Sequence, residues 1–177
     1  MRLFLIRHPV PLIDSGICYG RTDVAVALSE QARLATTLAM QLPPGLPVFT
    51  SPALRCTGLA DALGDRPAAR DARLAEMDFG EWEMRRWNDI ARPEIDAWAA
   101  DPIGYRPPGG ETVLEVARRV RMFQESLGEM AAIVVCHAGP IRLMQAWTTA
   151  ATLEDTAREA ARAPHRVGYG EVILLER

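Results

Sequence analysis

Two arginines and two histidines stand where short apolar segments of the sequence end. They are Arg7 and His8 after residues 3–6, Arg55 shortly after residues 47–50, and His137 after residues 132–136. If these segments are strands of one parallel sheet, their carboxyl ends meet at one edge and the four side chains converge there. Guanidinium groups bind phosphoryl oxygens in pairs, so a phosphomonoester with about two negative charges is the natural ligand.

Imidazole is the group in this set that can form a bond to phosphorus, because it keeps a lone pair at neutral pH when its other nitrogen is fixed. His8 is the better candidate by position, since it directly follows Arg7 at the end of an apolar strand. His137 is expected at a strand-to-helix junction, where a charged imidazole would stabilise the oxygens of the transferring group. Amides at the start of the helix after Gly139 can add further donors.

A leaving alkoxide needs a proton, so a carboxylic acid is expected near the mouth of the pocket. The segment 74–83 reads LAEMDFGEWE and supplies four carboxylates. The residues alone leave all four open. Any of these charged side chains, taken singly, is more often a solvated surface group, and it is their joint pattern that indicates a site.

The hydrophobic pattern alternates between short buried strands and amphipathic helices. Strands are predicted at 3–6, 47–50, 132–136 and 171–175, and helices at 28–42, 52–63, 112–127, 140–148 and 153–162. Ser51-Pro52 is typical of a helix start with Ser51 as the N-cap, and Thr112 with Glu115 matches a capping box. This order of elements predicts a three-layer α/β/α sandwich with a mostly parallel central sheet.

The chain has the length of one ordinary domain, 177 residues, and shows no repeat or linker that would divide it. Residues 65–110 contain three tryptophans and five prolines and are predicted to form an irregular segment that covers the site. The tryptophans are expected to pack this segment. The alternative is that one of them faces a heterocycle in the pocket.

Composition limits the partners. The net charge of −3 offers no general basic surface of the kind that binds nucleic acid. The apolar run at the N-terminus is too short for a signal sequence or a membrane span. Three cysteines without metal-ligand spacing favour reduced thiols in the cytoplasm. We therefore expect a small-molecule phosphomonoester as the partner, neither nucleic acid nor membrane, no metal and no cofactor, while a homodimer stays open.

Five motifs occur along the chain in the order of a known family. They are Arg7-His8, Ser51-Pro52-x-x-Arg55, Leu74-x-Glu76-x-x-Phe79-Gly80-x-Trp82-Glu83, Gly110-Glu111-Thr112 and Val135-x-His137-Ala138-Gly139. Over nearly the whole chain this pattern resembles the histidine phosphatase (phosphoglycerate mutase-like) superfamily. The resemblance implies a phosphoglycerate mutase-like fold and a single domain spanning residues 1–177.

The resemblance also implies roles for individual residues. His8 becomes the phosphorylated residue and Glu76 the proton donor, with Glu81 and Glu83 as the alternatives. Six residues become the remaining catalytic and substrate-binding set: Arg7, Arg55, His137, Ala138, Gly20 and Arg21. Within the superfamily, the stretches 20–23, 76–87 and 107–111 look most like alpha-ribazole phosphatases of cobalamin synthesis, whose substrate is alpha-ribazole 5′-phosphate.

The sequence departs from the family pattern at several positions. The usual Arg-His-Gly-Glu is Arg-His-Pro-Val here, and the glycine usual after Trp-Glu is Met84. Pro9 has no N–H to offer a phosphate, and Val10 removes a carboxylate near the pocket. Asp14 stands where many relatives have a phosphate-binding asparagine, so it would repel phosphate if it faced the pocket.

The expected function is a metal-independent phosphomonoesterase that acts through a phosphohistidine, with alpha-ribazole 5′-phosphate as the substrate that the resemblance implies. Three alternatives follow from the same residues: a broad-specificity small-molecule phosphatase, a phosphoglycerate mutase-like phosphotransferase, for which the chain is short, and a catalytically silent phosphate-binding scaffold. The scaffold is motivated by the loss of Gly and Glu after His8.

Overall fold

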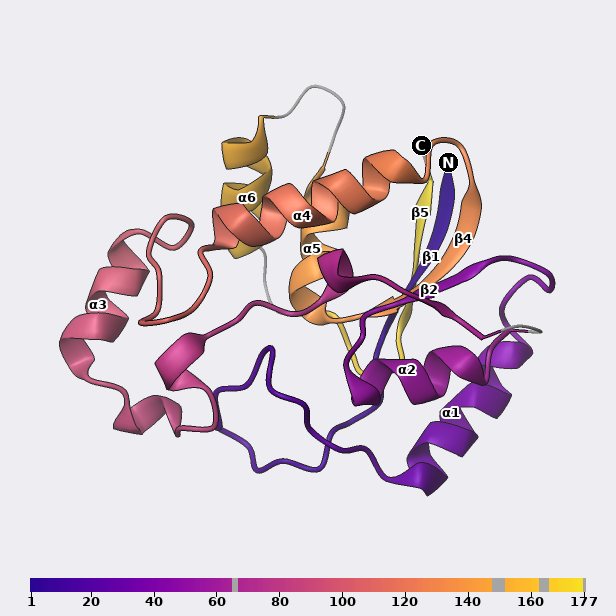
Figure 1. Cartoon of the computed structure of the whole chain (residues 1–177), viewed down its shortest axis with the longest axis horizontal. Helices are drawn as coiled ribbons and strands as arrows, with labels where there is room; N and C mark the ends of the chain where they lie inside the picture. The colour runs from indigo at the N-terminus through magenta and orange to yellow at the C-terminus, as the bar shows by residue number, and fades with distance from the viewer. Residues whose placement is uncertain (65–66, 148–151, 163–165, 177) are drawn as a thin grey trace.

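A central sheet of five strands, in the order β3-β2-β4-β1-β5, runs through the described part of the chain. A computed structural model describes residues 1–64, 67–147, 152–162 and 166–176 (Figure 1). The strands are β1 (Arg2–Arg7), β2 (Val48–Thr50), β3 (Ala69–Arg70), β4 (Ala131–Cys136) and β5 (Val172–Glu176). The first four lie parallel, and β5 pairs antiparallel with β1 at one edge.

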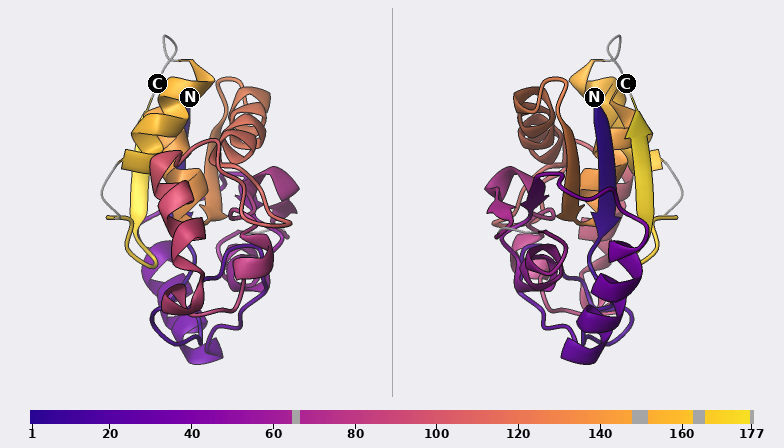
Figure 2. Two further views of the ribbon diagram at one scale, coloured as in Figure 1. Left: turned by 90° about the vertical axis from the view of Figure 1, so that its left-hand side faces the viewer. Right: turned by 90° about the vertical axis from the view of Figure 1, so that its right-hand side faces the viewer.

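Helices cover both faces of this sheet. They are α1 (Leu28–Ala39), α2 (Leu54–Asp61), α4 (Val113–Ser126), α5 (Ala138–Ala146) and α6 (Leu153–Arg162), whereas α3 (Arg92–Ala100) lies apart from the sheet (Figure 1). Alternate side chains of β1 point to opposite faces, so Leu3 and Leu5 pack with α4, α5 and α6, whereas Phe4 and Ile6 pack with α1 and α2. The three layers of the predicted α/β/α sandwich with a mostly parallel sheet are confirmed (Figures 1 and 2).

The register of the parallel strands brings the functional residues together. Arg7 of β1 lies beside Cys136 of β4, so His8 and His137 leave the sheet as neighbours at its carboxyl edge. Thr50, the last residue of β2, lies beside Val135 of β4. The residues after β2 therefore reach the same edge, as the pattern of interrupted apolar runs predicts.

Several element boundaries differ from the prediction. Helix α2 begins at Leu54 rather than at residue 52, and Ala53 rather than Ser51 is its N-cap. The Ser51 hydroxyl is instead committed to His137, as described below. Helix α5 begins at Ala138, two residues earlier than predicted, and ends at Ala146. The predicted end at residue 148 lies outside the described residues. The capping box of α4 is confirmed.

Much of the segment 67–110 is irregular, with three short 3₁₀ turns and the nine-residue helix α3. Its aromatic side chains form a small core of their own around Trp82, which is fully buried and whose indole N–H donates to Glu94 (2.6 Å). Trp87 and Trp98 stack on each other, with ring centroids 5.7 Å apart. The three tryptophans therefore pack against one another, as expected, and two of them, Trp87 and Trp98, also line the cavity described below. In the described residues no helix combines the length and apolarity needed to cross a bilayer.

Candidate active site

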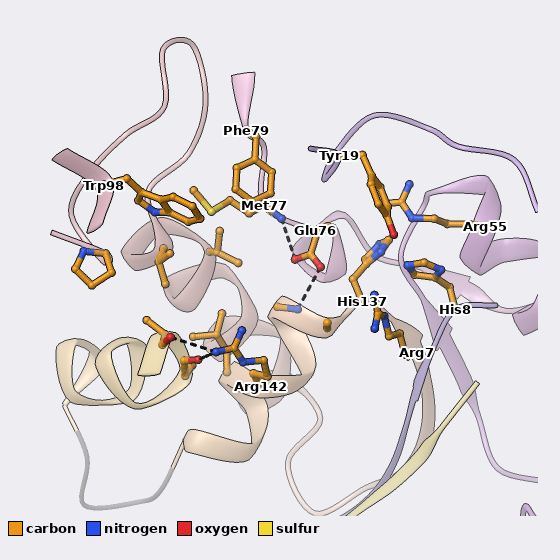
Figure 3. A pocket seen from close by; sticks show the side chains of 18 of the residues that line it. Arg7, His8, Tyr19, Arg55, Glu76, Met77, Phe79, Trp98, His137 and Arg142 are labelled. Atoms are coloured by element: carbon orange, nitrogen blue, oxygen red, sulfur yellow. Dashed lines mark hydrogen bonds between the residues drawn. The ribbon is translucent and has the colours of Figure 1, made fainter. Parts of the chain in front are cut away.

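A cavity of about 440 Å³ opens at the carboxyl edge of the sheet. One end is cationic and is lined by Arg7, His8, Arg55 and His137 (Figure 3). The other end is mainly apolar and includes side chains of the segment 77–102, with Arg142 at its side. The carboxylate of Glu76 lies between the two ends. The sequence-predicted catalytic residues are thus brought to one cavity, although they come from segments that are far apart in the sequence.

His8 is fixed by its own neighbour in the chain. It is 2 % exposed, and its Nδ1–H donates to the Pro9 carbonyl (2.7 Å). Because a carbonyl can only accept, the proton sits on Nδ1 and the Nε2 lone pair stays available. Burial lowers the pKa of His8 to about 3, and the charges of Arg55 and Arg7 act in the same direction. At neutral pH the ring is therefore neutral and can act as a nucleophile.

Arg7 and Arg55 place two positive charges beside His8 without carboxylate partners in the described part of the chain. Arg55 is 1 % exposed and donates to the carbonyls of Thr22 (2.8 Å) and Gly20. Arg7 donates to the Val167 carbonyl (2.6 Å). The Nε–H of each arginine is buried and has no hydrogen-bond partner within the described residues. One buried and one partly buried cation, both with spare donors and neither paired with a carboxylate, are the physical requirement of an anion site.

His137 lies at the start of α5, and its ring centroid is 5.1 Å from that of His8. Its Nε2 shares a 2.7 Å hydrogen bond with the Ser51 hydroxyl. Burial lowers the pKa of His137 well below its ordinary value, and Arg55 adds to this effect. The ring is therefore neutral in the ligand-free protein, and a charged imidazole in the phosphate complex stays a prediction. A neutral His137 contributes a hydrogen bond rather than a charge, unless a bound dianion brings in a proton.

The carboxylate of Glu76 is held by two backbone N–H groups, those of Met77 (3.1 Å) and Gly139 (3.2 Å). A Cβ at residue 139 would collide with Glu76 Oε1, so glycine makes room for this approach. The Gly139 amide, near the start of α5, therefore serves Glu76.

The other three carboxylates of the segment 74–83 do not line this cavity. Glu83 accepts hydrogen bonds from four backbone N–H groups, those of Gly20, Arg21, Thr22 and Phe79. Asp78 accepts from Gly80 (2.8 Å) and Arg21 (3.3 Å), and Glu81 is exposed. Position alone therefore favours Glu76 among the four alternatives.

The remaining three predicted substrate-binding residues, after Arg7 and Arg55, occupy different places. Ala138 lines the main cavity. Gly20 and Arg21 line a second cavity of about 400 Å³ that shares Arg55, Glu76 and His137 with the first. Gly20 supports Arg55 through its carbonyl, while the Arg21 side chain is 70 % exposed and pairs with Asp78.

The departures from the family pattern have structural consequences that differ from one another. Pro9 uses its carbonyl to orient His8, a role that needs no N–H. Asp14 points to solvent with its side chain 82 % exposed and lies 3.8 Å from Arg86, so it does not repel a ligand in the cavity. Val10 is half exposed. Met84 adopts φ +64°, a left-handed conformation that explains why glycine is usual there.

Four residues near the site were not singled out from the sequence. Tyr169 stacks on the Arg7 guanidinium at 3.7 Å, and its hydroxyl lies 3.0 Å from that of Tyr19. Arg142 lines the cavity and donates to the carbonyls of α6. The side chain of Arg119 is largely buried, with 17 % of it exposed. The spacing of Arg119 from Val116 and Phe123, three and four residues away on the buried face of α4, is a signal that could have identified it.

Acid is expected to destabilise the fold through its buried histidines. The folded-state pKa of His8, about 3, lies below the ordinary value of 6.5. Between these values the unfolded chain binds more protons than the folded one, so the free energy of unfolding rises with pH through this window and is constant above it. For His8 alone the loss between pH 7.5 and pH 5 is about 2 kcal/mol. Urea unfolding at both pH values, in phosphate-free buffer, measures it.

The variant His8→Asn is the control for this prediction. It removes the ionisable ring and is expected to reduce the difference in unfolding free energy between the two pH values by about 2 kcal/mol. An unchanged difference would show that His8 is not held neutral by its surroundings.

The fold and the cavity define an α/β protein that gathers two neutral histidines, two arginines and one carboxylate at the carboxyl edge of a mostly parallel sheet. The chain belongs to the histidine phosphatase superfamily (branch 1), whose family model matches residues 3–166. The family predicted from the sequence is thereby confirmed.

Several known proteins and solved structures are similar to this chain over most of its length. The chain is 32 % identical over 157 residues to the adenosylcobalamin/alpha-ribazole phosphatase of Escherichia coli K12, covering 81 % of this chain and 77 % of that protein. It is 27 % identical over 166 residues to "Putative phosphoserine phosphatase 2" of Hydrogenobacter thermophilus, covering 87 % and 81 %. The alpha-ribazole phosphatase structure from Shigella flexneri superposes with a TM-score of 0.76 at 28 % identity, covering 89 % and 84 %. The phosphoglycerate mutase structure from Thermus thermophilus superposes at 0.77 and 28 % identity, covering 99 % and 93 %.

Proposed function

We propose that this chain is a metal-independent phosphomonoesterase that transfers the phosphoryl group of its substrate through His8. One observation carries the proposal: a neutral, oriented imidazole lies beside a buried and a partly buried guanidinium group, neither of which has an anionic partner in the described residues. A phosphate dianion supplies the missing charge and accepts the spare N–H groups. The phosphatase names of several relatives support the same reaction class.

In the first half-reaction, the Nε2 lone pair of His8 attacks phosphorus as the bond from phosphorus to the leaving oxygen breaks. Arg7 and Arg55 neutralise the charge on the phosphoryl oxygens, while Nδ1–H remains bonded to the Pro9 carbonyl. A dianion close to Glu76 disfavours a second negative charge there, so the Glu76 carboxyl carries a proton in the complex and delivers it to the leaving oxygen.

In the second half-reaction, the Glu76 carboxylate takes a proton from water as the water oxygen attacks phosphorus. The bond between phosphorus and Nε2 of His8 breaks, which releases inorganic phosphate and restores the neutral imidazole. Each protein group ends the cycle in its starting state. No step requires a metal ion, because the two guanidinium groups carry the electrostatic role that a cation would have.

The apolar end of the cavity suggests the kind of leaving group. Phe79, Met77 and Trp98 line it, and Glu76 lies at its junction with the cationic end (Figure 3). Trp87 also lines the cavity and stacks on Trp98. The buried Nε1–H of Trp98 has no partner in the described residues and can serve an acceptor on the substrate. Planar, largely apolar groups fit such a wall. We propose alpha-ribazole 5′-phosphate as the substrate, with the names of the relatives from Escherichia coli and Shigella flexneri as support.

The reaction class is tested by trapping the intermediate. Acid-free quenching during turnover is expected to yield an acid-labile, alkali-stable phosphoryl adduct on the peptide that contains His8, with release of inorganic phosphate. A native protein that turns over no phosphomonoester would leave the phosphate-binding scaffold as the better interpretation. Retention of a bisphosphate intermediate, with phosphoryl return to product, would instead favour the mutase-like alternative.

The substrate is tested separately with a panel of alpha-ribazole 5′-phosphate, O-phosphoserine, 3-phosphoglycerate and p-nitrophenyl phosphate. We expect kcat/KM for alpha-ribazole 5′-phosphate to exceed that for p-nitrophenyl phosphate. Equal values would support the broad-specificity alternative and leave the mechanism intact.

The cellular setting is a proposal as well. We infer a cytoplasmic protein, because the three cysteines are unpaired and buried. A small-molecule phosphomonoester is the proposed partner. Light scattering tests whether the chain forms the homodimer that the sequence leaves open.

A further inference from the structure

The segment that carries Glu76 has little regular structure of its own. It follows the short 3₁₀ turn Ala72–Leu74 and runs on without a helix or strand to the next turn at Gly80–Trp82. A carboxylate on such a segment is placed only as well as its backbone is held. The contacts that hold this backbone are therefore of functional interest.

Arg119 of α4 binds this backbone. Its Nη1 donates to the carbonyls of Arg73 (2.9 Å) and Ala75 (2.6 Å), and its Nη2 donates to the carbonyl of Glu76 itself (3.0 Å). One guanidinium thus binds the carbonyls of three of the four residues 73–76. Because α4 is a 14-residue helix with a complete capping box, it is a rigid support for this contact.

Glu111 holds Arg119 and the same segment of backbone, so Arg119 and Glu111 together form a clamp on the Glu76 segment. Glu111 binds Arg119 in a bidentate pair, with Nε to Oε1 at 3.1 Å and Nη2 to Oε2 at 3.0 Å. The same Oε2 accepts from the Asp78 N–H (3.0 Å), and the Glu111 N–H donates to the Asp78 carbonyl (2.8 Å). The pair therefore holds the chain on both sides of Glu76.

Arg119 differs from Arg7 and Arg55 in its remaining hydrogen-bonding capacity. A guanidinium has five N–H groups. Arg119 makes five hydrogen bonds to protein acceptors, namely three to carbonyls and two to Glu111. The other two arginines each keep a spare Nε–H within the described residues. Arg119 lines the second cavity, but binding a substrate there would require it to give up a bond to the Glu76 segment.

We propose that Arg119 and Glu111 are positioning residues for proton transfer: together they fix the Glu76 carboxylate at the boundary between the cationic and apolar ends of the cavity. This inference rests on the proposed role of Glu76 as proton donor. It assigns a function to the Gly110-Glu111-Thr112 motif. None of these three residues is among the described residues that line the main cavity.

The test separates leaving groups that need a proton from those that do not. The variant Arg119→Gln is compared with Arg118→Gln, a matched control one residue away that is exposed on α4. For an alkyl phosphomonoester, whose alkoxide needs a proton, Arg119→Gln is expected to lower kcat/KM by about 30-fold, a fraction of what general acid catalysis contributes. For p-nitrophenyl phosphate the loss is expected to stay below about 3-fold, since p-nitrophenolate leaves without a proton. Arg118→Gln is expected to change neither.

Equal losses for both substrates would overturn the proposal, because they would show general damage to the pocket rather than a misplaced acid. Glu111→Gln keeps the shape of the side chain and provides the same test should Arg119→Gln fail to fold. Its expected result is the same selective loss, smaller in size.

The variant Glu76→Gln, measured in parallel, separates this proposal from the one on which it rests. If Glu76→Gln shows the selective loss and the Arg119 and Glu111 variants do not, the clamp has no positioning role and the proposed function stands. If Glu76→Gln itself affects both substrates equally, the assignment of the proton donor is wrong.

Discussion

The variant His8→Asn is expected to lose the phosphoryl adduct and to lower kcat/KM for every phosphomonoester by about 10⁴-fold or more, as is usual when a nucleophile is removed. Asparagine can still donate an N–H to the Pro9 carbonyl, as Nδ1 of His8 does at 2.7 Å, but has no counterpart of the Nε2 lone pair. The change therefore removes the reacting atom and keeps its support. Steady-state kinetics and intact-protein mass spectrometry of quenched samples measure the two effects.

Binding of inorganic phosphate is the control for this variant. Arg7 and Arg55 are untouched, so phosphate is expected to raise the melting temperature of His8→Asn about as much as that of the wild type. An adduct that persists in His8→Asn would place the nucleophile elsewhere. His137, whose ring lies 5.1 Å away, would then be the first alternative.

The convergence of His8 and His137 could be predicted because it follows from local sequence. Both histidines end an apolar run, and parallel pairing of β1 with β4 puts Arg7 opposite Cys136, which carries the next residues to the same edge. The physical cause is the regular geometry of a parallel sheet, which converts the end of a strand in sequence into a place in space. Hydrophobic pattern was therefore enough for this half of the site.

The choice of carboxylate could not be predicted from residue types. The four acidic side chains lie within eight positions, and their directions depend on backbone turns at Gly80 and Met84, which have φ of +55° and +64°. These turns place Glu83 against the N–H groups of residues 20–22 and leave Glu76 at the cavity. Only the resemblance to the family selected Glu76 in advance.

Contacts between distant segments were missed for a related reason. Tyr169 stacks on Arg7 from 162 positions along the chain, and Arg119 holds carbonyls more than 40 positions away. Nothing in the sequence around one residue of such a pair indicates the other residue. Ser51 shows the cause most clearly: its type and its neighbour Pro52 favour an N-cap, but its short contact is with His137 (2.7 Å), and only a long bond from the Ala53 N–H (3.4 Å) is local.

Arg55→Ala is expected to lower kcat/KM by about 10³-fold, because it removes a preorganised donor to the transferring group in a site that excludes water. Arg55 is 1 % exposed and donates to the carbonyls of Gly20 and Thr22, so the residue both binds phosphate and closes the loop 20–22 over the pocket. A loss of this size in kcat as well as kcat/KM is expected, since the charge acts on the transition state. Kinetics with p-nitrophenyl phosphate measure it without the complication of leaving-group protonation.

Arg55→Lys separates charge from shape. Lysine keeps the positive charge beside His8 but cannot make the paired contacts of a guanidinium, so a loss of about 10²-fold is expected. Because the charge of Arg55 contributes to the lowered pKa of His8, that pKa is expected to rise in Arg55→Ala and to stay low in Arg55→Lys, as followed by NMR titration of the ring. If both variants lost activity equally and left the His8 titration unchanged, the only role of Arg55 would be to hold the loop 20–22 through its carbonyls. The anion site would then have to be built around Arg7.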